Sequence, residues 1–270
     1  MKKFLSIALA AASIAFACAF TGCSGGEATV NYTLSEDGSY YIVSSVTGNK
    51  KALKSYEIPA TYSAEEGGVK LPVTTIADSA FYQCRSLRTV LIPDSVTSIG
   101  NLAFALSGLT EVTIPDSVQT IGYSAFGMCS YLESVVIPSS VTSLGNRVFM
   151  ECAKLERAEV YANITDLKGG SFYNSVVSTG GNIYMNSSLT EIVLSASITK
   201  IADSALAGNM FTDIYFMGTK EQWDELYFYT FEKKENSNPD AEPEYEEKAL
   251  EKKDCLPSST VVHFNYVPEK

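Results

Sequence analysis

Apolar residues recur along this chain at a regular interval. The clearest marker is phenylalanine, which returns at Phe81, Phe104, Phe126, Phe149 and Phe172. The pattern L-x-x-V-x-I followed by proline repeats with the same spacing, at 87–93, 109–115 and 132–138. A period in the low twenties is typical of a leucine-rich solenoid, so we predict one repeat solenoid over 56–217.

The alternation inside each unit predicts one short strand per coil. Val90 and Ile92 are separated by one variable residue and so point to the same side of a strand. Pro93 cannot donate a backbone hydrogen bond, so the strand ends before it. A single coil cannot cover its own apolar lining, and stacked coils cover it for each other. We therefore predict a parallel β-sheet on the concave face, with short strands and turns elsewhere.

Two insertions interrupt the period. Pro59 and Pro93 lie further apart than one repeat allows, and so do Phe172 and Leu206. The excess is the same in both places and equals about half a repeat. The first insertion falls near 64–70. The second falls near 173–184 and should form a projecting loop or hairpin.

The two ends of the chain carry other patterns. Alternating residues around Asp37-Gly38 predict a β-hairpin cap over 30–55. Residues 218–270 predict a C-terminal cap with a helix beginning at Thr219, which forms a capping box with Gln222. Trp223, Leu226 and Tyr227 would share one face of this helix, and 260–267 would form a strand pairing with the last coil. Between these elements, 232–254 is rich in charge and poor in large apolar groups, which predicts a flexible insertion.

The N-terminus has the features of a targeting segment. Lys2 and Lys3 precede an apolar run from Phe4 to Phe20, which is shorter than the roughly 20 apolar residues of a membrane span. We therefore predict a signal peptide over 1–22. The sequence Phe20-Thr21-Gly22-Cys23 resembles a bacterial lipobox, which implies acylation of Cys23 and a lipid-anchored tether over 23–29. Ordinary secretion, with cleavage after Ala17 or Ala19, is the alternative.

The net charge of the chain disfavours some classes of binding partner. The formal charge is −11, and it becomes −13 when the two lysines of residues 1–22 are removed. An acidic surface argues against nucleic acid, whose phosphates require Lys and Arg. It also argues against a face lying on anionic lipid, so the acyl chains remain as the membrane contact.

The motif set has a family resemblance. L-x-x-V-x-I-P, then V-T-x-I-G, then A-F with a Cys three residues later, resembles the BspA-like leucine-rich repeats of bacterial surface proteins. Aligned in this way, the cysteine column contains Cys84, Leu106, Cys129 and Cys152. The resemblance implies protein binding or adhesion at the cell surface, without a cofactor. The rival functions are a structural envelope lipoprotein without an external partner and an accessory module that positions glycans.

The sequence offers little for catalysis or metal binding. It contains no G-x-S-x-G, no phosphate-binding glycine loop and no H-E-x-x-H, and its only histidine is His263. We therefore predict no catalytic residue and no enzymatic activity. One Cys per coil does not supply converging ligands, so no metal site is predicted. Cys129 and Cys152 fall in one column of adjacent coils, which permits a disulfide, although we favour buried free thiols.

Residues that alternate with the core positions should point outward from the concave sheet. We predict one such column as the ligand-binding face: Leu91, Thr113, Val136, Glu159, Val193 and Tyr215. The column beside it contains Thr89, Glu111, Ser134, Arg157, Glu191 and Asp213. The first column is partly apolar and the second mostly acidic, as expected of a recognition surface. The alternative is that solvent-facing positions vary because nothing constrains them.

Overall fold

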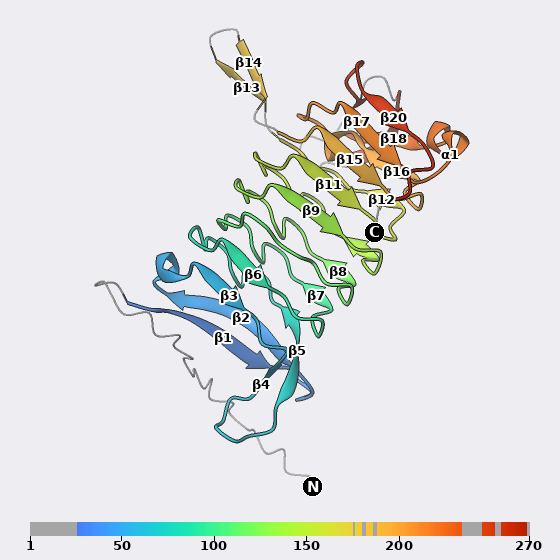
Figure 1. Ribbon diagram of the computed structural model, residues 1–270. Helices are drawn as coiled ribbons and strands as arrows, with labels where there is room; N and C mark the ends of the chain where they lie inside the picture. The colour runs from blue at the N-terminus through green and yellow to red at the C-terminus, as the bar shows by residue number, and fades with distance from the viewer. Residues whose placement is uncertain are drawn as a thin grey trace, which may run out of the picture.

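The computed structural model describes residues 26–174, 176–179, 182–185, 188–233, 245–251 and 255–268. The predicted signal peptide, Cys23 and the first part of the tether lie outside these residues. The coils stack along one direction from the N-terminal to the C-terminal end of the chain (Figure 1). This arrangement confirms the predicted repeat solenoid.

The strand predicted from the L-x-x-V-x-I motif forms what we call the first sheet. Two of its strands, β3 (Ser55–Glu57) and β6 (Thr89–Leu91), pair in parallel. The others form a five-stranded parallel sheet. These are β9 (Ser134–Ile137), β11 (Arg157–Val160), β15 (Glu191–Leu194), β17 (Asp213–Phe216) and β20 (Val261–His263). The predicted final strand is therefore β20, which pairs with the last coil as expected.

The first sheet is interrupted between β6 and β9, where 111–114 is not a strand. This coil is one residue short, because Leu109 follows Ser107 by two residues whereas Leu132 follows Cys129 by three. The shortened turn is tight: a Cβ at Gly108 would lie 2.2 Å from the carbonyl oxygen of Arg85. The core side chains of the coil remain buried, so only the ladder is lost.

The same deletion corrects the predicted cysteine column. Ser107, not Leu106, takes the cysteine position, because its N–H donates to the carbonyl of Phe104 as that of Cys129 donates to Phe126. Leu106 instead adopts φ 58°. The alignment on Leu106 implied a deletion before Leu106, whereas the structure has it after Ser107.

A second strand in most coils forms two further sheets. One contains the antiparallel hairpin β1 (Ala28–Leu34) and β2 (Tyr41–Gly48), followed by the parallel strands β5 (Leu71–Ile76), β7 (Ser98–Ile99), β8 (Thr120–Ile121) and β10 (Ser143–Leu144). The other contains β12 (Asp166–Leu167), β16 (Lys200–Ala202), β18 (Tyr227–Lys233) and β19 (Tyr245–Leu250). Two short 3-10 helices, η1 (Lys50–Ala52) and η2 (Asp203–Ala205), lie in the turns. The hairpin thus extends the sheet at the N-terminal end.

The repeated phenylalanines form a continuous stack inside the solenoid. Ring centroids of successive Phe residues from 81 to 172 lie 5.0, 5.2, 5.3 and 5.4 Å apart, with planes within 10° of parallel. All five side chains are fully buried. In the coils of the first four, the residues two before and two after each Phe adopt positive φ although none is glycine. This costs some backbone strain, which the buried stack offsets.

The second insertion forms a pair of strands, whereas the first connects two strands. β13 (Val176–Thr179) and β14 (Asn182–Met185) form an antiparallel hairpin that projects from the solenoid (Figure 1, yellow). The predicted projecting hairpin is therefore confirmed. The first insertion, near 64–70, connects β4 (Thr61–Tyr62) to β5, and these two strands pair antiparallel.

The C-terminal elements differ in part from the prediction. Helix α1 (Lys220–Asp224) has the predicted capping box of Thr219 and Gln222. Trp223 and Leu226 are buried, but Tyr227 belongs to β18, not to a helical face. Pairing of β18 with β16 overrides the local helical pattern after Leu226.

The predicted flexible insertion 232–254 contains an ordered strand. Residues 245–250 form β19, antiparallel to β18, and 234–244 and 252–254 lie outside the described residues. The charges that argued against order remain on the surface, where Lys248 contacts Glu232 at 2.7 Å and Lys200 contacts Glu247 at 3.1 Å. Backbone pairing to an available edge orders this segment with little apolar burial, since only Leu250 of β19 packs against the core. Charged side chains on such an edge strand also oppose pairing with another chain.

Candidate functional site

The register of the first sheet aligns the outward residues into the two predicted columns. Val136, Glu159, Val193, Tyr215 and His263 lie side by side on successive strands. Leu91 lies on β6, and Thr113 lies in the coil that lacks a strand. The neighbouring column contains Ser134, Arg157, Glu191, Asp213 and Val261 in the same register. We call the first of these the outward column.

The N-terminal half of the outward column is open. Leu91 is 60% exposed and Val136 is 46% exposed. Thr113 between them is exposed, as are Glu111 and Ser134 in the neighbouring column. We call Leu91, Thr113 and Val136 the N-terminal patch. It presents two aliphatic side chains to solvent beside polar neighbours.

The C-terminal half of the outward column is covered, so the prediction that Val193 is exposed is wrong. Val193 has 0% exposure although it points outward. The ring of Tyr266 lies 4.9 Å from that of Tyr215 on β17, and its hydroxyl lies 3.4 Å from Arg157 Nη2 on β11. The Arg157 guanidinium reaches from β11 across β15 to within 5.6 Å of the Tyr215 ring, so Arg157 and Tyr266 together lie over β15, which carries Val193. The C-terminal segment, 264–268, covers this part of the face.

Charged groups fix this covering segment. Arg157 contacts Glu159 at 2.8 Å and also pairs with Glu191. Hydrogen bonding to Glu159 raises the pKa of the Arg157 guanidinium. Burial opposes ionisation of Glu159, but hydrogen bonds from Tyr161 and Arg157 outweigh it and lower the pKa of Glu159. Glu159 is therefore ionised at neutral pH, and its carboxylate already accepts hydrogen bonds from Arg157 and Tyr161 of the same chain.

His263 takes part in the same cover. Its ring stacks on Tyr215 with centroids 4.6 Å apart, and its Nε2 lies 2.7 Å from Asp213 Oδ1. The hydrogen bond with His263 lowers the pKa of Asp213. These contacts join β20 to β17 and give His263 a structural role.

The cysteines of the repeat column are thiols held inside the core. Cys129 Sγ lies 3.2 Å from Ser107 Oγ, and Cys152 Sγ lies 3.3 Å from the carbonyl oxygen of Phe126. Burial raises the pKa of the Cys129 thiol to about 11. Cys84, Cys129 and Cys152 form no disulfide. The structure therefore has buried free thiols at Cys129 and Cys152, not a disulfide.

The part of the chain that the structure describes contains no candidate metal site and no candidate membrane-spanning helix. Within those residues, no group of three or more His, Cys, Asp or Glu is placed to hold a metal ion. No helix among them combines the length and apolar character needed to cross a membrane.

The stacked coils and parallel first sheet define a leucine-rich repeat solenoid. A family model described as "BspA type Leucine rich repeat region" matches residues 61–177 and 172–238, in 6 copies. Because the matched residues are more than half of the chain, the protein belongs to this family. No curated protein sequence matches the chain.

Several solved structures are similar to this chain. The Treponema pallidum leucine-rich repeat protein TpLRR is 27% identical, with 68% of this chain and 78% of that chain covered, and a TM-score of 0.56. The pneumococcal vaccine antigen PcpA is 20% identical, with coverage of 87% and 48% and a TM-score of 0.55. A leucine-rich repeat protein of Bacteroides ovatus is 23% identical, with coverage of 73% and 55% and a TM-score of 0.50. The last two likenesses show the fold alone, and the chain spans about half the length of those two proteins.

Proposed function

We propose that this chain is an extracytoplasmic, lipid-anchored repeat protein that binds a protein partner or mediates adhesion at the cell surface, without catalysis. Its segments 30–55 and 218–270 cap the solenoid in this proposal. Proteins with BspA-type repeats are typically bacterial cell-surface proteins, and leucine-rich repeats generally mediate protein interactions.

The observation that carries the proposal is the contrast between the two halves of the outward column. Val193 is covered by the chain's own C-terminal segment, whereas Leu91 and Val136 stay exposed. Burial of the exposed apolar area of these two side chains against a partner is favourable, at roughly 25 cal/mol per Å². The N-terminal patch is therefore the part of the first sheet that supports docking of a protein.

The size of the patch limits the strength of one contact. Leu91 and Val136 lie two coils apart, which is about 10 Å at a strand spacing of about 4.8 Å. Two outward residues along each strand lie about 7 Å apart, so the patch with its neighbouring column is on the order of 100 Å². A standard stable interface buries roughly 800 Å² per partner. We therefore expect weak binding by one copy and strong binding by many anchored copies through avidity.

The test compares single and arrayed copies of the chain from residue 24 onward. Monomer and bead-coupled protein are added to intact cells, before and after protease treatment of the cells. We expect arrays to bind untreated cells only, because the proposed partner is a protein. The double variant Leu91→Asp with Val136→Asp should lose array binding.

The matched control is Val69→Asp, which places the same charge at an exposed valine outside the first sheet. It should bind as the unmodified chain does. Equal binding by the folded double variant would remove the N-terminal patch from the proposal. Binding that survives protease treatment would exclude a protein partner.

A structural envelope role is distinguished by protease treatment of cells that carry the protein. Release of solenoid fragments from intact cells supports surface display. Complete protection of the protein supports the structural envelope lipoprotein instead.

A further inference from the structure

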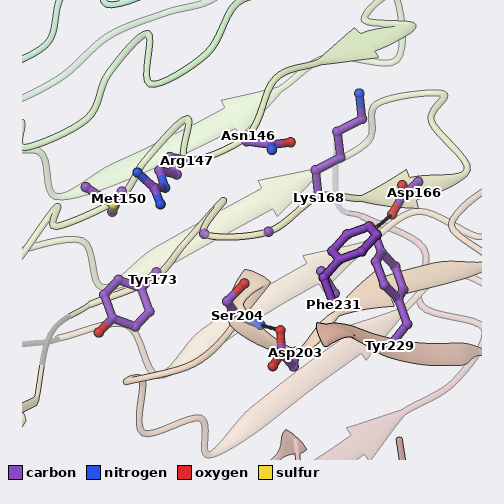
Figure 2. Close-up of a pocket in the computed structure, with 13 residues that line it drawn as sticks. Asn146, Arg147, Met150, Asp166, Lys168, Tyr173, Asp203, Ser204, Tyr229 and Phe231 are labelled. Carbon is purple, nitrogen blue, oxygen red and sulfur yellow. Dashed lines mark hydrogen bonds between the residues drawn. The ribbon is translucent and has the colours of Figure 1, made fainter. Parts of the chain in front are cut away.

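A hollow of about 650 Å³ lies on another part of the molecule, beside β12, β16 and β18 (Figure 2). Gly169 and Gly170 are part of its lining. None of the residues of the N-terminal patch lines it. The proposed protein-binding function therefore does not use this hollow.

The hollow arises from a gap in a column of side chains. In the other coils the position three before the repeated Phe or Leu carries Asp78, Asn101, Tyr123, Asn146 and Asp203. These side chains link neighbouring coils: the Asn101 amide donates to Asp78 at 2.9 Å, and the N–H of Tyr123 donates to Asn101 Oδ1 at 2.8 Å. Gly169 occupies the same position in its coil. The missing side chain leaves backbone open between Asn146 and Asp203.

An aromatic wall forms another part of the lining. Tyr227, Tyr229 and Phe231 alternate along β18 and so share one face. Tyr229 is buried and its hydroxyl donates to Asp166 at 2.8 Å, with its ring 5.5 Å from that of Phe231. Phe231 ends the row and is 59% exposed. An exposed phenylalanine at the rim of a hollow is a surface suited to stacking with a ligand.

Polar groups complete the lining. Asp166 and Asp203 supply carboxylates, and Lys168 and Arg147 supply cations, so the formal charges of the lining balance. The lining has no net charge, although the chain as a whole has a formal charge of −11. The hollow therefore does not favour a charged ligand of either sign. Carboxylates accept hydrogen bonds from hydroxyls, whereas ammonium and guanidinium groups donate to them. The lining therefore combines an aromatic plate with groups that bind hydroxyls from two sides.

We propose that this hollow binds a segment of a neutral saccharide, with Phe231 stacking on the apolar face of a sugar ring. Asp166, Asp203 and Lys168 hydrogen-bond its hydroxyls, and the absence of a side chain at Gly169 leaves room for the ring. The volume lies within the range of about 300–1,000 Å³ that is typical of small-ligand pockets. This is a second binding function, separate from the N-terminal patch.

The test is titration calorimetry of the chain from residue 24 onward, which holds every described residue. The probes are hexasaccharides of glucose, mannose and N-acetylglucosamine, with oligogalacturonate as an acidic arm. We expect at least one neutral probe to bind with a Kd below about 1 mM. The N-acetylglucosamine arm separates cell-wall glycans from hexose polysaccharides as the source.

Two variants and a matched control locate the site. Phe231→Ala should weaken binding at least tenfold, whereas Tyr245→Ala should leave it unchanged, since Tyr245 is also 59% exposed in the β18–β19 hairpin but does not line the hollow. Gly169→Gln should also block binding. A Cβ there lies 3.0 Å from Ser204 Oγ, which must shift slightly, and 3.9 Å from Ala202 Cβ, so we expect the variant to fold, and a thermal melt checks this.

Several outcomes would overturn the proposal. They are the absence of binding by every neutral probe at 5 mM (about five times the expected Kd), binding of oligogalacturonate alone, or equal loss in the Phe231 and Tyr245 variants. The double variant Leu91→Asp with Val136→Asp should keep its saccharide binding. Failure of either proposal therefore leaves the other standing.

Discussion

At the scale of single residues, the phenylalanine stack is the part of the core that one substitution disturbs most directly. Phe126 stacks on Phe104 at 5.2 Å and on Phe149 at 5.3 Å. Phe126→Ala removes both contacts and leaves a cavity between two coils. We expect the free energy of unfolding to fall by about 3–5 kcal/mol, measured by urea denaturation.

The matched variant at this position is Phe126→Leu, which retains most of the buried volume. It should lower the free energy of unfolding less than Phe126→Ala. Equal losses for the two variants would contradict a role for packing volume in the stack.

Glu159 gives the covered half of the outward column a defined pH dependence. Its pKa is lowered in the folded protein, so its contribution to stability is full above the unfolded pKa of about 4.3 and is lost as the pH falls through the lower folded pKa. At pH 7 we expect the unmodified protein to have a higher melting temperature than the Glu159→Gln variant. This difference should shrink as the pH is lowered toward 3. Thermal melts of both forms at several pH values measure this. A constant difference would show that ionisation of Glu159 contributes nothing.

At the scale of elements, the C-terminal segment determines whether Val193 is core or surface. In the full chain, Val193→Asp would bury a carboxylate beneath Tyr266, and we expect it to cost more than about 2 kcal/mol of the free energy of unfolding. Deleting 264–270 should reduce that cost sharply, because the position then faces solvent. Urea denaturation of the four combinations measures the coupling. An unchanged cost after deletion would mean that another part of the chain covers Val193.

The sequence predicted the elements that depend on local periodicity. The spacing of the Phe residues and the alternation in L-x-x-V-x-I were sufficient to predict the coils. They also correctly placed Val136, Glu159 and Tyr215 in one column. Burial of Val193 escaped this reasoning because it depends on Tyr266, which is distant in sequence. The strand β19 escaped it because that segment is ordered mainly by backbone pairing with β18, with Leu250 alone packing against the core. In both places a contact between distant segments overrides the local pattern.

The shortened coil could have been placed correctly from the sequence. Counting three residues on from Phe104 reaches Ser107, so the missing residue falls after Ser107, and the alignment on Leu106 was a misplacement. The contact of Gly108 with Arg85 is a steric signal visible only in three dimensions. The hollow over Gly169 is comparable: the glycine is plain in the sequence, but the wall formed by Phe231 belongs to a strand that was predicted as part of a helix and an insertion.

At the scale of the whole molecule, the number of copies held on one surface determines how strongly the two proposed surfaces act. Both the weak protein contact and the saccharide site gain from many copies held on one surface, since avidity can multiply the effective affinity by about 10²–10⁴ without new contacts. An anchor at the start of the chain would supply this arrangement. The N-terminal sequence therefore bears on how strongly either surface acts.

We propose that Cys23 is that anchor, because Phe20-Thr21-Gly22-Cys23 follows an apolar run too short for a membrane span. Acyl chains on one residue hold a protein durably where a single chain holds it only marginally. The unmodified protein should fractionate with membranes, whereas Cys23→Ala should appear in the soluble fraction or as an unprocessed precursor. Ser24→Ala is the matched control and should remain with membranes. Mass spectrometry should find an acylated N-terminus at Cys23, and an unmodified N-terminus at Cys18 or Phe20 would instead establish ordinary secretion.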